Sequence, residues 1–289
     1  MIRQRYLRRR SPSILIALVL VMWSTVAQTP PQSNKYSWLD GRCRWGSIAE
    51  RVQPPTGYER PESVPGTLAD WLRHLPLRAG KAPVRLYDGE ERRVQGVHHA
   101  IIDIDIGDKN LQQCADAVIR LYAEYLYSLE EYGKIHFNFT SGDTAWFSNW
   151  LAGYRPVMDG NVVYWSKTVG VDTSYENFRR YLDVVFTYSG SYSLSQELQP
   201  VGDVRDMKIG DVFIQGGFPG HAVIVVDMAV NQATGNKVFL IAQSYMPAQD
   251  IHILKNIQDA GISPWYSTEF GDRLITPEWH FCKDDLMRF

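Results

Sequence analysis

Three short apolar runs close to one another in the second half of the chain most constrain its fold. Their brevity, and the β-branched residues of the last two, favour strands over helices. The break at 231–236 contains Gly235 and neighbouring polar residues, which suit a tight turn. We therefore expect an antiparallel hairpin with a further strand beside it. The three runs are 212–214, 222–226 and 238–242.

His221 stands where the second of these strands begins, directly after a glycine-rich loop at 216–220. An antiparallel hairpin brings the start of one strand opposite the end of the next, here Gln243 or Ser244. An imidazole with open backbone around it and a polar partner across the hairpin suits proton transfer. The alternative is that His221 only closes a turn, and the choice depends on whether the chain supplies a nucleophile.

The first 27 residues have the pattern of a signal peptide. A basic segment with Arg3 and Arg8 precedes an apolar run at 14–22, and the small residues at 25–27 suit cleavage. The apolar run is short for a membrane span, so we expect removal, and a protein exported to the periplasm or the extracellular space. No stable membrane span is expected after removal.

The remaining chain is acidic, because the signal segment holds basic residues and no acidic ones. An acidic chain without a basic patch is not expected to bind nucleic acid. Aromatic residues make up 12% of the sequence, and they serve either to fill a core or to line a groove for sugars or peptides.

Three cysteines, Cys43, Cys114 and Cys282, occur in a chain expected to reach an oxidising compartment. An odd count leaves at least one thiol without a partner in the same chain. A Cys43–Cys282 disulfide would join the two ends of the mature chain and leave Cys114 free. This pairing is a hypothesis, and the sequence equally allows the other pairings.

We expect an irregular, proline-rich arm at 28–65 and a single α+β domain at 66–289. The domain would begin with a helix at 67–75 and strands at 84–87 and 97–106. The adjacent His98 and His99 would point to opposite faces of a strand and so cannot share a metal. The acidic residues at 103–108 lack the spacing of a calcium loop. No metal and no cofactor is therefore expected.

The longest predicted helix is capped by Asp108 or Asn110 and runs to about Glu131, with apolar residues along one stripe. Cys114 falls in its first turn. A helix N-terminus lowers the pKa of a thiol and can hold an oxyanion, and Gln112 and Gln113 are amide donors beside it. The alternative is a small buried cysteine on an amphipathic helix.

Residues at about 132–205 look like an aromatic-rich helical insertion. A strand near 135–139 precedes predicted helices that start at Asp143 and Ser174, and a shorter helical turn at 192–198. Trp146 and Trp150 lie on the first of these helices and are candidates for binding substrate.

Cys114 at a helix start, His221 at a strand start and Gln243 on the next strand follow the order of parts in papain-like cysteine hydrolases. With Gly210-Asp211-Val212-Phe213 and Gly220-His221-Ala222, the chain resembles NlpC-type and CHAP-type cell-wall peptidases. The resemblance implies a papain-like core, with a long helix packed on an antiparallel sheet. It also implies Cys114 as nucleophile, His221 as base and Gln243 as the residue that orients the imidazole.

The mature chain also resembles an exported bacterial family named for domain of unknown function 4846. The phrases that carry this resemblance are Gln112-Gln113-Cys114-Ala115-Asp116-Ala117, Gly210–Gly217 and Ala242–Pro247. Two functions remain: a cysteine-dependent amide hydrolase of cell-wall peptides, or a non-catalytic scaffold that binds envelope glycan or peptide. A metal-dependent hydrolase is disfavoured, since no histidine motif for zinc is present.

Overall fold

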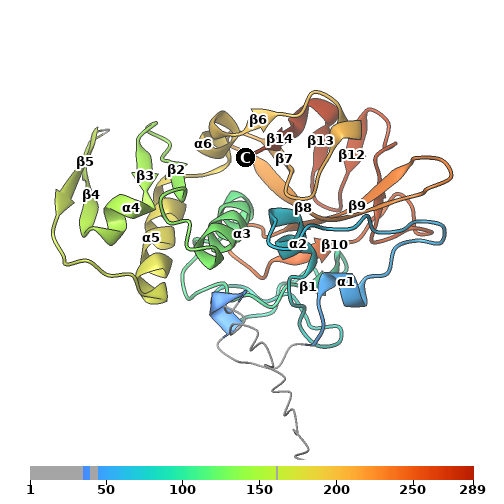
Figure 1. The fold of residues 1–289 in the computed structure, drawn as a ribbon, viewed down its shortest axis with the longest axis horizontal. Coiled ribbons are helices and arrows are strands. Elements are labelled where there is room, and N and C mark those ends of the chain that lie inside the picture. Colours follow the sequence, from blue (N-terminus) through green and yellow to red (C-terminus); the bar gives the residue numbers. More distant parts are fainter. Residues whose placement is uncertain (1–34, 40–44, 161) are drawn as a thin grey trace, which may run out of the picture. The chain divides into compact units, whose positions relative to one another are not determined.

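The predicted strands at 212–214, 222–226 and 238–242 lie in the middle of an antiparallel sheet of eight strands (Figure 1). The computed structural model describes residues 35–39, 45–160 and 162–289, and all of these belong to one compact unit. The strand order is β1-β10-β9-β8-β7-β14-β6, and β11 pairs with a further part of β9. The strands are β1 (His98–Ile101), β6 (Gln199–Pro200), β7 (Val212–Gln215), β8 (His221–Val230), β9 (Lys237–Gln243), β10 (His252–Leu254), β11 (Tyr266–Ser267) and β14 (Leu286–Arg288).

The hairpin β8–β9 turns where the sequence predicts. Gly235 has φ of +76° in this turn, and its N–H bonds to the carbonyl of Asn231. Positive φ is readily adopted by glycine because it has no Cβ. The pairing runs from Val230 opposite Lys237 to Ile224 opposite Ala242, with an irregularity after Val225. All three strands are confirmed and extend beyond the apolar runs.

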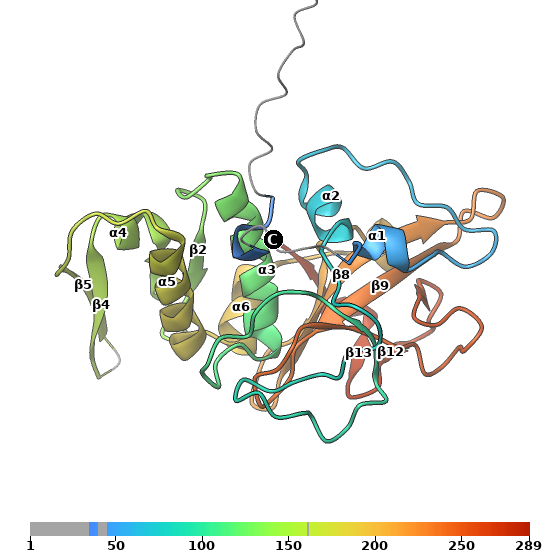
Figure 2. The same cartoon turned by 90° about the horizontal axis from the view of Figure 1, so that it is seen from below.

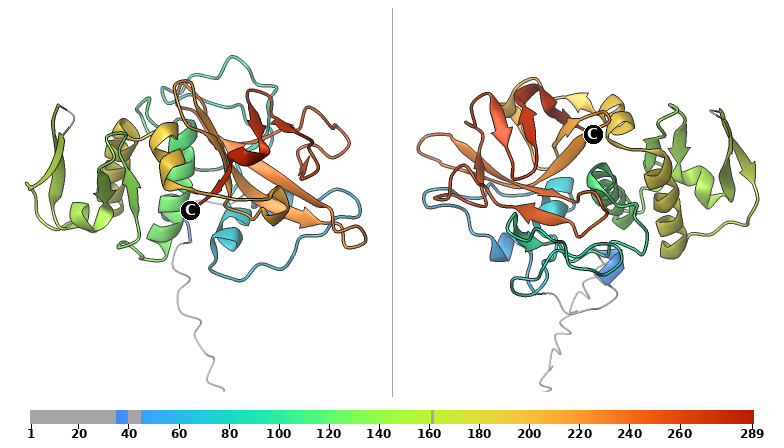
Figure 3. Two further views of the ribbon diagram at one scale, coloured as in Figure 1. Left: turned by 90° about the horizontal axis from the view of Figure 1, so that it is seen from above. Right: turned by 180° about the vertical axis from the view of Figure 1, so that it is seen from behind.

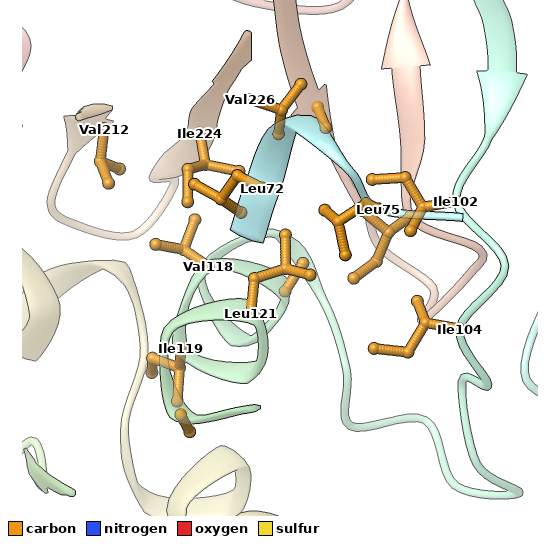
Figure 4. Packing of buried hydrophobic residues seen from close by; sticks show 14 of the residues in the cluster. Leu72, Leu75, Ile102, Ile104, Val118, Ile119, Leu121, Val212, Ile224 and Val226 are labelled. Atoms are coloured by element: carbon orange, nitrogen blue, oxygen red, sulfur yellow. The ribbon is translucent and has the colours of Figure 1, made fainter. Parts of the chain in front are cut away.

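One face of the sheet is covered by α2 (Leu68–Arg73) and α3 (Cys114–Ser128). Figure 4 shows Leu72 next to Ile224, with Val118 and Leu121 of α3 pointing toward the same cluster. These side chains are fully buried, and each contributes roughly 1.5–3 kcal/mol relative to an exposed position. The apolar stripe of α3 therefore fixes this helix against the sheet.

The opposite face of the sheet carries a second apolar cluster under the C-terminal hairpin of β12 (Arg273–Ile275) and β13 (His280–Cys282). Phe213, Phe239 and Phe281 are buried there. Figures 2 and 3 show this hairpin beside β8 and β9, away from α2. Successive side chains of β7–β9 thus point alternately into two apolar clusters, one on each face of the sheet. Because both faces are buried, the sequences of these strands are continuously apolar.

The long helix begins later than predicted. Its N-cap is Gln113, and Cys114 is its first residue, so neither Asp108 nor Asn110 caps it. The Asn110 side chain instead accepts a hydrogen bond from the N–H of Ala248, at 2.8 Å. The local sequence pattern predicts that Asn110 caps the helix, but its side chain instead binds a backbone group that is distant in the sequence.

The insertion contains more strand than predicted. It holds two separate hairpins, β2–β3 and β4–β5, next to its helices, so it is only partly helical. The helix predicted from Asp143 is wrong at its start, since residues 144–146 pair with β2 before the helix begins. The elements are β2 (His136–Asn138), β3 (Thr144–Trp146), α4 (Phe147–Leu151), β4 (Tyr154–Asp159), β5 (Val162–Lys167), α5 (Tyr175–Tyr188) and α6 (Ser191–Glu197).

Two further local predictions are corrected. The described part of the arm contains the 3-10 turn η1 (Ser37–Leu39) and α1 (Ile48–Arg51), where Ser47 and Glu50 form a capping box. The strand predicted at 84–87 makes only isolated bridges, to Glu91 and Gln249. Short 3-10 turns at Val204–Asp206 (η2) and Lys283–Asp285 (η3) complete the elements.

The predicted signal peptide and Cys43 lie outside the described residues. Cys282 is exposed, and it forms no disulfide with a cysteine of the described residues. Within residues 35–39, 45–160 and 162–289, no helix is long and apolar enough to cross a membrane. The same residues contain no group of three or more His, Cys, Asp or Glu side chains placed to hold a metal.

Candidate functional site

A cavity of about 550 Å³ lies where α3 and β8 begin. Cys114 and His221 both line it, although 107 positions separate them in the sequence. The rim carries Phe218 and Met246, which are 88% and 67% exposed. The start of the long helix and the start of a central strand thus meet at one concave surface, which is the usual form of a small-molecule or peptide site.

Cys114 is partly buried at the first position of α3. Burial raises the pKa of its thiol, and the nearby carboxyl of Asp116 raises it further. Backbone N–H groups of Ala222, Ala115 and Cys114 itself oppose this effect by donating toward the sulfur. The expected depression of the pKa by the helix N-terminus is therefore outweighed, and the neutral thiol is the resting form near neutral pH.

His221 is buried at the first position of β8, opposite Gln215 of β7. Its Nε2 lies 2.7 Å from Oε1 of Gln243. Burial lowers the pKa of the imidazole, while the bond to Gln243 and the charge of Glu278 partly oppose that. His221 is thus neutral near neutral pH, the form that accepts a proton.

Gln243, at the end of β9, connects His221 to a partly buried ion pair. Its Nε2 donates to Oε2 of Glu278 at 2.7 Å, and Glu278 in turn pairs with Arg92. The predicted contact between His221 and Gln243 is present. The Glu278 carboxylate binds the other side of the Gln243 amide, and the Arg92 guanidinium binds Glu278. His221 is therefore held by a connected polar network and not by a single neighbour.

Aromatic rings enclose the His221 imidazole. The ring of Tyr245 lies 5.1 Å away, that of Trp279 lies 5.3 Å away, and that of Phe281 is stacked at 6.0 Å. The Trp279 indole donates to Oε1 of Gln215 at 2.9 Å, which fixes its position. This packing restricts rotation of the imidazole and excludes water from its bond to Gln243.

Asp116 is a buried carboxyl that also lines the cavity. Its Oδ2 accepts from the N–H of Gln113 at 3.0 Å, while Oδ1 has no hydrogen-bond partner among the described residues. Burial raises its pKa to about 8, although the N–H groups of Gln113 and Asp116 oppose this. Near neutral pH the residue is mostly a neutral acid, and its charge opposes ionisation of Cys114 once it ionises itself, above about pH 8.

The insertion supplies one wall of the cavity, where α5 ends and α6 begins, through Phe186, Thr187, Ser189, Gly190 and Ser191. This wall contacts the glycine loop that precedes His221. A Cβ added at Gly220 would lie 2.2 Å from Ser191 Oγ and 2.7 Å from the carbonyl oxygen of Gln215. The close approach requires glycine at this position and fixes the distance between the wall and β8.

The remaining predicted site residues lie apart from one another. Gln113 lines the cavity. Gln112 is buried with its Oε1 on Arg120, at 3.0 Å, and points into the interior. Trp150 is buried, with its indole donating to Asn177, and Trp146 stacks on His136. Neither tryptophan lines the cavity, because the insertion uses both to hold its own elements together.

Sequence reasoning missed Arg92, Asp116, Tyr245, Glu278 and Trp279. The segment 276–279 carries a turn signal but nothing that indicates its neighbours. The side chain and backbone of Thr276 bond to the backbone of Trp279, which holds Glu278 and Trp279 in a rigid turn. Asp116 is at the third position of α3, where an acidic residue commonly caps a helix. Its sequence position therefore indicates a capping role and gives no sign that it lines a cavity.

Fold and site together define a mixed α/β protein with a large antiparallel sheet, in which a cysteine and a histidine line one cavity. Residues 48–288 match the model of the family described as Domain of unknown function (4846). The match covers well over half of the chain, so the chain belongs to this family, as the sequence phrases indicate. No curated protein and no solved structure matches the chain significantly.

Proposed function

We propose that the protein is an exported cysteine-dependent amide hydrolase that acts on peptides of the cell wall. The observation that supports this most is the shared cavity of Cys114 and His221, with the imidazole held by Gln243. The order of the three residues, on a helix start, a strand start and the next strand, is that of papain-like hydrolases. We extend the proposal to a papain-like core on the same ground.

In this scheme the Cys114 sulfur attacks the amide carbonyl carbon while His221 takes the thiol proton. The proton then passes to the leaving amine as the C–N bond breaks, which leaves a thioester on the sulfur. Water attacks the thioester, His221 takes a proton from that water, and the thiol is restored as the acid leaves. Because burial favours the neutral forms of both groups, proton transfer accompanies attack and does not precede it.

The oxyanion formed on the carbonyl oxygen would meet N–H donors at the start of α3. The N–H groups of Cys114 and Ala115 already point toward the sulfur, and the Gln113 side chain lines the cavity beside them. Such fixed donors stabilise charge that develops in the transition state. Gln113 is therefore the amide donor we assign, and Gln112 is not.

A peptide suits the lining of this cavity. Gly190, Gly217 and Gly220 line it, so backbone groups are accessible to a second backbone. Within the described part of the chain, no Lys or Arg lines the cavity, and Asp116 is its one acidic side chain. We therefore propose that the amide to be cleaved lies inside a stem peptide and that no carboxylate of the substrate lies next to Asp116.

The test is digestion of purified peptidoglycan, followed by chromatography and mass spectrometry of the released fragments. The wild-type protein should release fragments with new amino termini, and Cys114→Ala should release none while keeping its circular dichroism spectrum. Equal release by Cys114→Ala would overturn the assignment of the nucleophile. Gln53→Ala, an exposed change far from Cys114 in the sequence, is the matched control.

A binding scaffold without turnover is the second candidate, favoured by the raised pKa of Cys114, which disfavours the thiolate form. The positions of Trp146 and Trp150 weaken it, since neither lines the cavity. Sedimentation with insoluble peptidoglycan distinguishes the two. A scaffold would be retained on the polymer and would release no fragments.

A further inference from the structure

The amide of Gln243 is bonded on both sides, and its partners determine which way it faces. On one side, Nε2 lies 2.7 Å from the carboxylate of Glu278 and 3.5 Å from Nε2 of His252. A carboxylate only accepts hydrogen bonds, so an amide NH₂ and not an amide oxygen must face Glu278. The oxygen of Gln243 then faces His221, 2.7 Å from its Nε2.

His252 supports the same orientation. Its Nδ1 lies 2.8 Å from the carbonyl oxygen of Asp250, which can only accept, so the proton of His252 is on Nδ1. Burial lowers the pKa of His252 to about 3, so the ring is neutral and its Nε2 is a lone pair. Both hydrogens of the Gln243 amide therefore point at acceptors, and a flipped amide would lose both interactions.

Arg92 holds Glu278 in place. It forms an ion pair with Oε1 of Glu278, which leaves Oε2 for Gln243. Both side chains are mostly buried, at 12% and 13% exposed, and the guanidinium also lies over the ring of Tyr245. With Arg92 on one oxygen and Gln243 on the other, the Glu278 carboxylate has little freedom to rotate.

We propose that Glu278, held by Arg92, is a positioning residue that sets the tautomer of His221 through Gln243. The Gln243 oxygen accepts the proton of Nε2, so Nδ1 carries the lone pair. Nδ1 makes no hydrogen bond with any described residue, and it is not among the buried polar atoms that lack a partner, so it is accessible. Because His221 lines the same cavity as Cys114, we place the accessible Nδ1 on the side of that cavity. Glu278 thereby keeps the base ready for the Cys114 proton. Its catalytic consequence rests on the proposed function, but the tautomer does not.

The test is two-bond ¹H–¹⁵N correlation of the full-length protein, labelled with ¹⁵N-histidine, near neutral pH. His221 should show a protonated Nε2 and an unprotonated Nδ1. In Glu278→Gln the new amide can donate as well as accept, so Gln243 can flip, and a second set of His221 signals with a protonated Nδ1 should arise. Glu269→Gln, which neutralises an exposed carboxylate, should leave the spectrum unchanged.

A wild-type spectrum with the proton on Nδ1 overturns the proposal and needs no variant to fold. An unchanged tautomer in a folded Glu278→Gln variant also overturns the role of Glu278. If the protein hydrolyses peptidoglycan, kcat/KM of Glu278→Gln should fall about 10-fold or more, mainly in kcat. If the Nε2–H tautomer is present and wild-type protein hydrolyses nothing, the proposed function fails and this inference stands.

Discussion

Alkylating reagents react with a cysteine through its thiolate, and the surroundings of Cys114 oppose that form. Because burial and Asp116 raise its pKa, alkylation by iodoacetamide should be slow at pH 7 and should increase steeply with pH beyond the ordinary thiol range. The exposed Cys282 is an internal reference in the same molecule. Mass spectrometry of the two cysteine-containing peptides, sampled from pH 6 to pH 10, measures both rates in one experiment.

Rapid alkylation of Cys114 at pH 6 to 7, faster than that of Cys282, would contradict this prediction. It would mean that an imidazolium–thiolate pair forms before substrate arrives. The same experiment on His221→Ala separates the two cases, since loss of a preformed ion pair would slow alkylation, whereas a neutral pair predicts little change.

Asp116 makes the stability of the protein depend on pH. Its folded-state pKa of about 8 lies above the ordinary value near 4, so between these values the folded state binds more protons than the unfolded state. The stabilisation is complete below about pH 4 and is lost as pH rises to about 8. Asp116→Asn keeps an oxygen for the N–H of Gln113 and removes the titration, so it should exceed wild type in stability by a few kcal/mol at pH 9 and by far less at pH 4.

Urea unfolding at pH 4, 6 and 9 measures this difference. An Asp116→Asn advantage that stays constant across the three values would refute the buried neutral acid. Asp143→Asn, a partly exposed acid in the insertion, is the control and should shift stability little at any pH.

At the scale of single residues, the sequence identifies the candidate catalytic residues better than it identifies the residues that surround them. Cys114, His221 and Gln243 are found from the positions where helices and strands begin and end, because those follow local patterns. Glu278 and Arg92 cannot be found in this way, because 35 positions separate Glu278 from Gln243 and 186 separate it from Arg92. Local sequence patterns do not indicate contacts between residues so far apart in the chain. The lowered pKa expected at the helix start is likewise reversed by burial, which depends on the whole packed neighbourhood.

The helix α3 carries a buried charge network that joins the core to the insertion. Arg120 is fully buried and bonds to Glu124 at 2.7 Å, and Tyr175 of α5 donates to the same carboxylate at 2.6 Å. Arg120→Met would leave Glu124 buried without a counter-charge, and removal of one partner of a buried pair costs about 3–5 kcal/mol. The free energy of unfolding in urea should fall by this amount.

The matched control is Lys109→Ala. Lys109 forms an exposed ion pair with Asp183 of α5, so it joins the same parts of the chain at the surface. Exposed pairs contribute about 0–1 kcal/mol, and this variant should remain close to wild type. An equal loss of unfolding free energy in both variants would show that any lost contact with α5 is destabilising, whether or not the charge is buried.

At the scale of elements, the sequence predicts those whose neighbours are close in the chain. The strands β7, β8 and β9 and the helix α5, capped by Ser174, follow from local apolar pattern and turn residues. The hairpin β4–β5 was missed, because its strands are partly exposed and lack a continuous apolar run. The start of α3 was misplaced because Asn110 bonds to a loop 138 positions away.

At the scale of the whole molecule, the cavity exists because the insertion stands against the central sheet. Gly190 lies on the insertion side of it, in an extended backbone that any residue adopts, and a Cβ added there would meet no atom within 4 Å. Gly190→Leu should therefore preserve the fold and place an isobutyl group in the cavity. If peptide binds there, release of fragments from peptidoglycan should fall at least about tenfold, chiefly through KM, because the added group removes uniform binding.

Gly133→Leu is the control for the leucine itself. Gly133 is exposed, a Cβ there is equally unobstructed, and the residue does not line the cavity. Full activity in Gly190→Leu, with Gly133→Leu also active, would mean that substrate approaches Cys114 from the side of Phe218 and Met246 and does not use the insertion wall. Loss of activity in both variants would instead indicate a general effect on folding, which the urea midpoint of each variant would reveal. A loss confined to Gly190→Leu requires that the insertion and the sheet bind the peptide together, so that neither part alone carries the site.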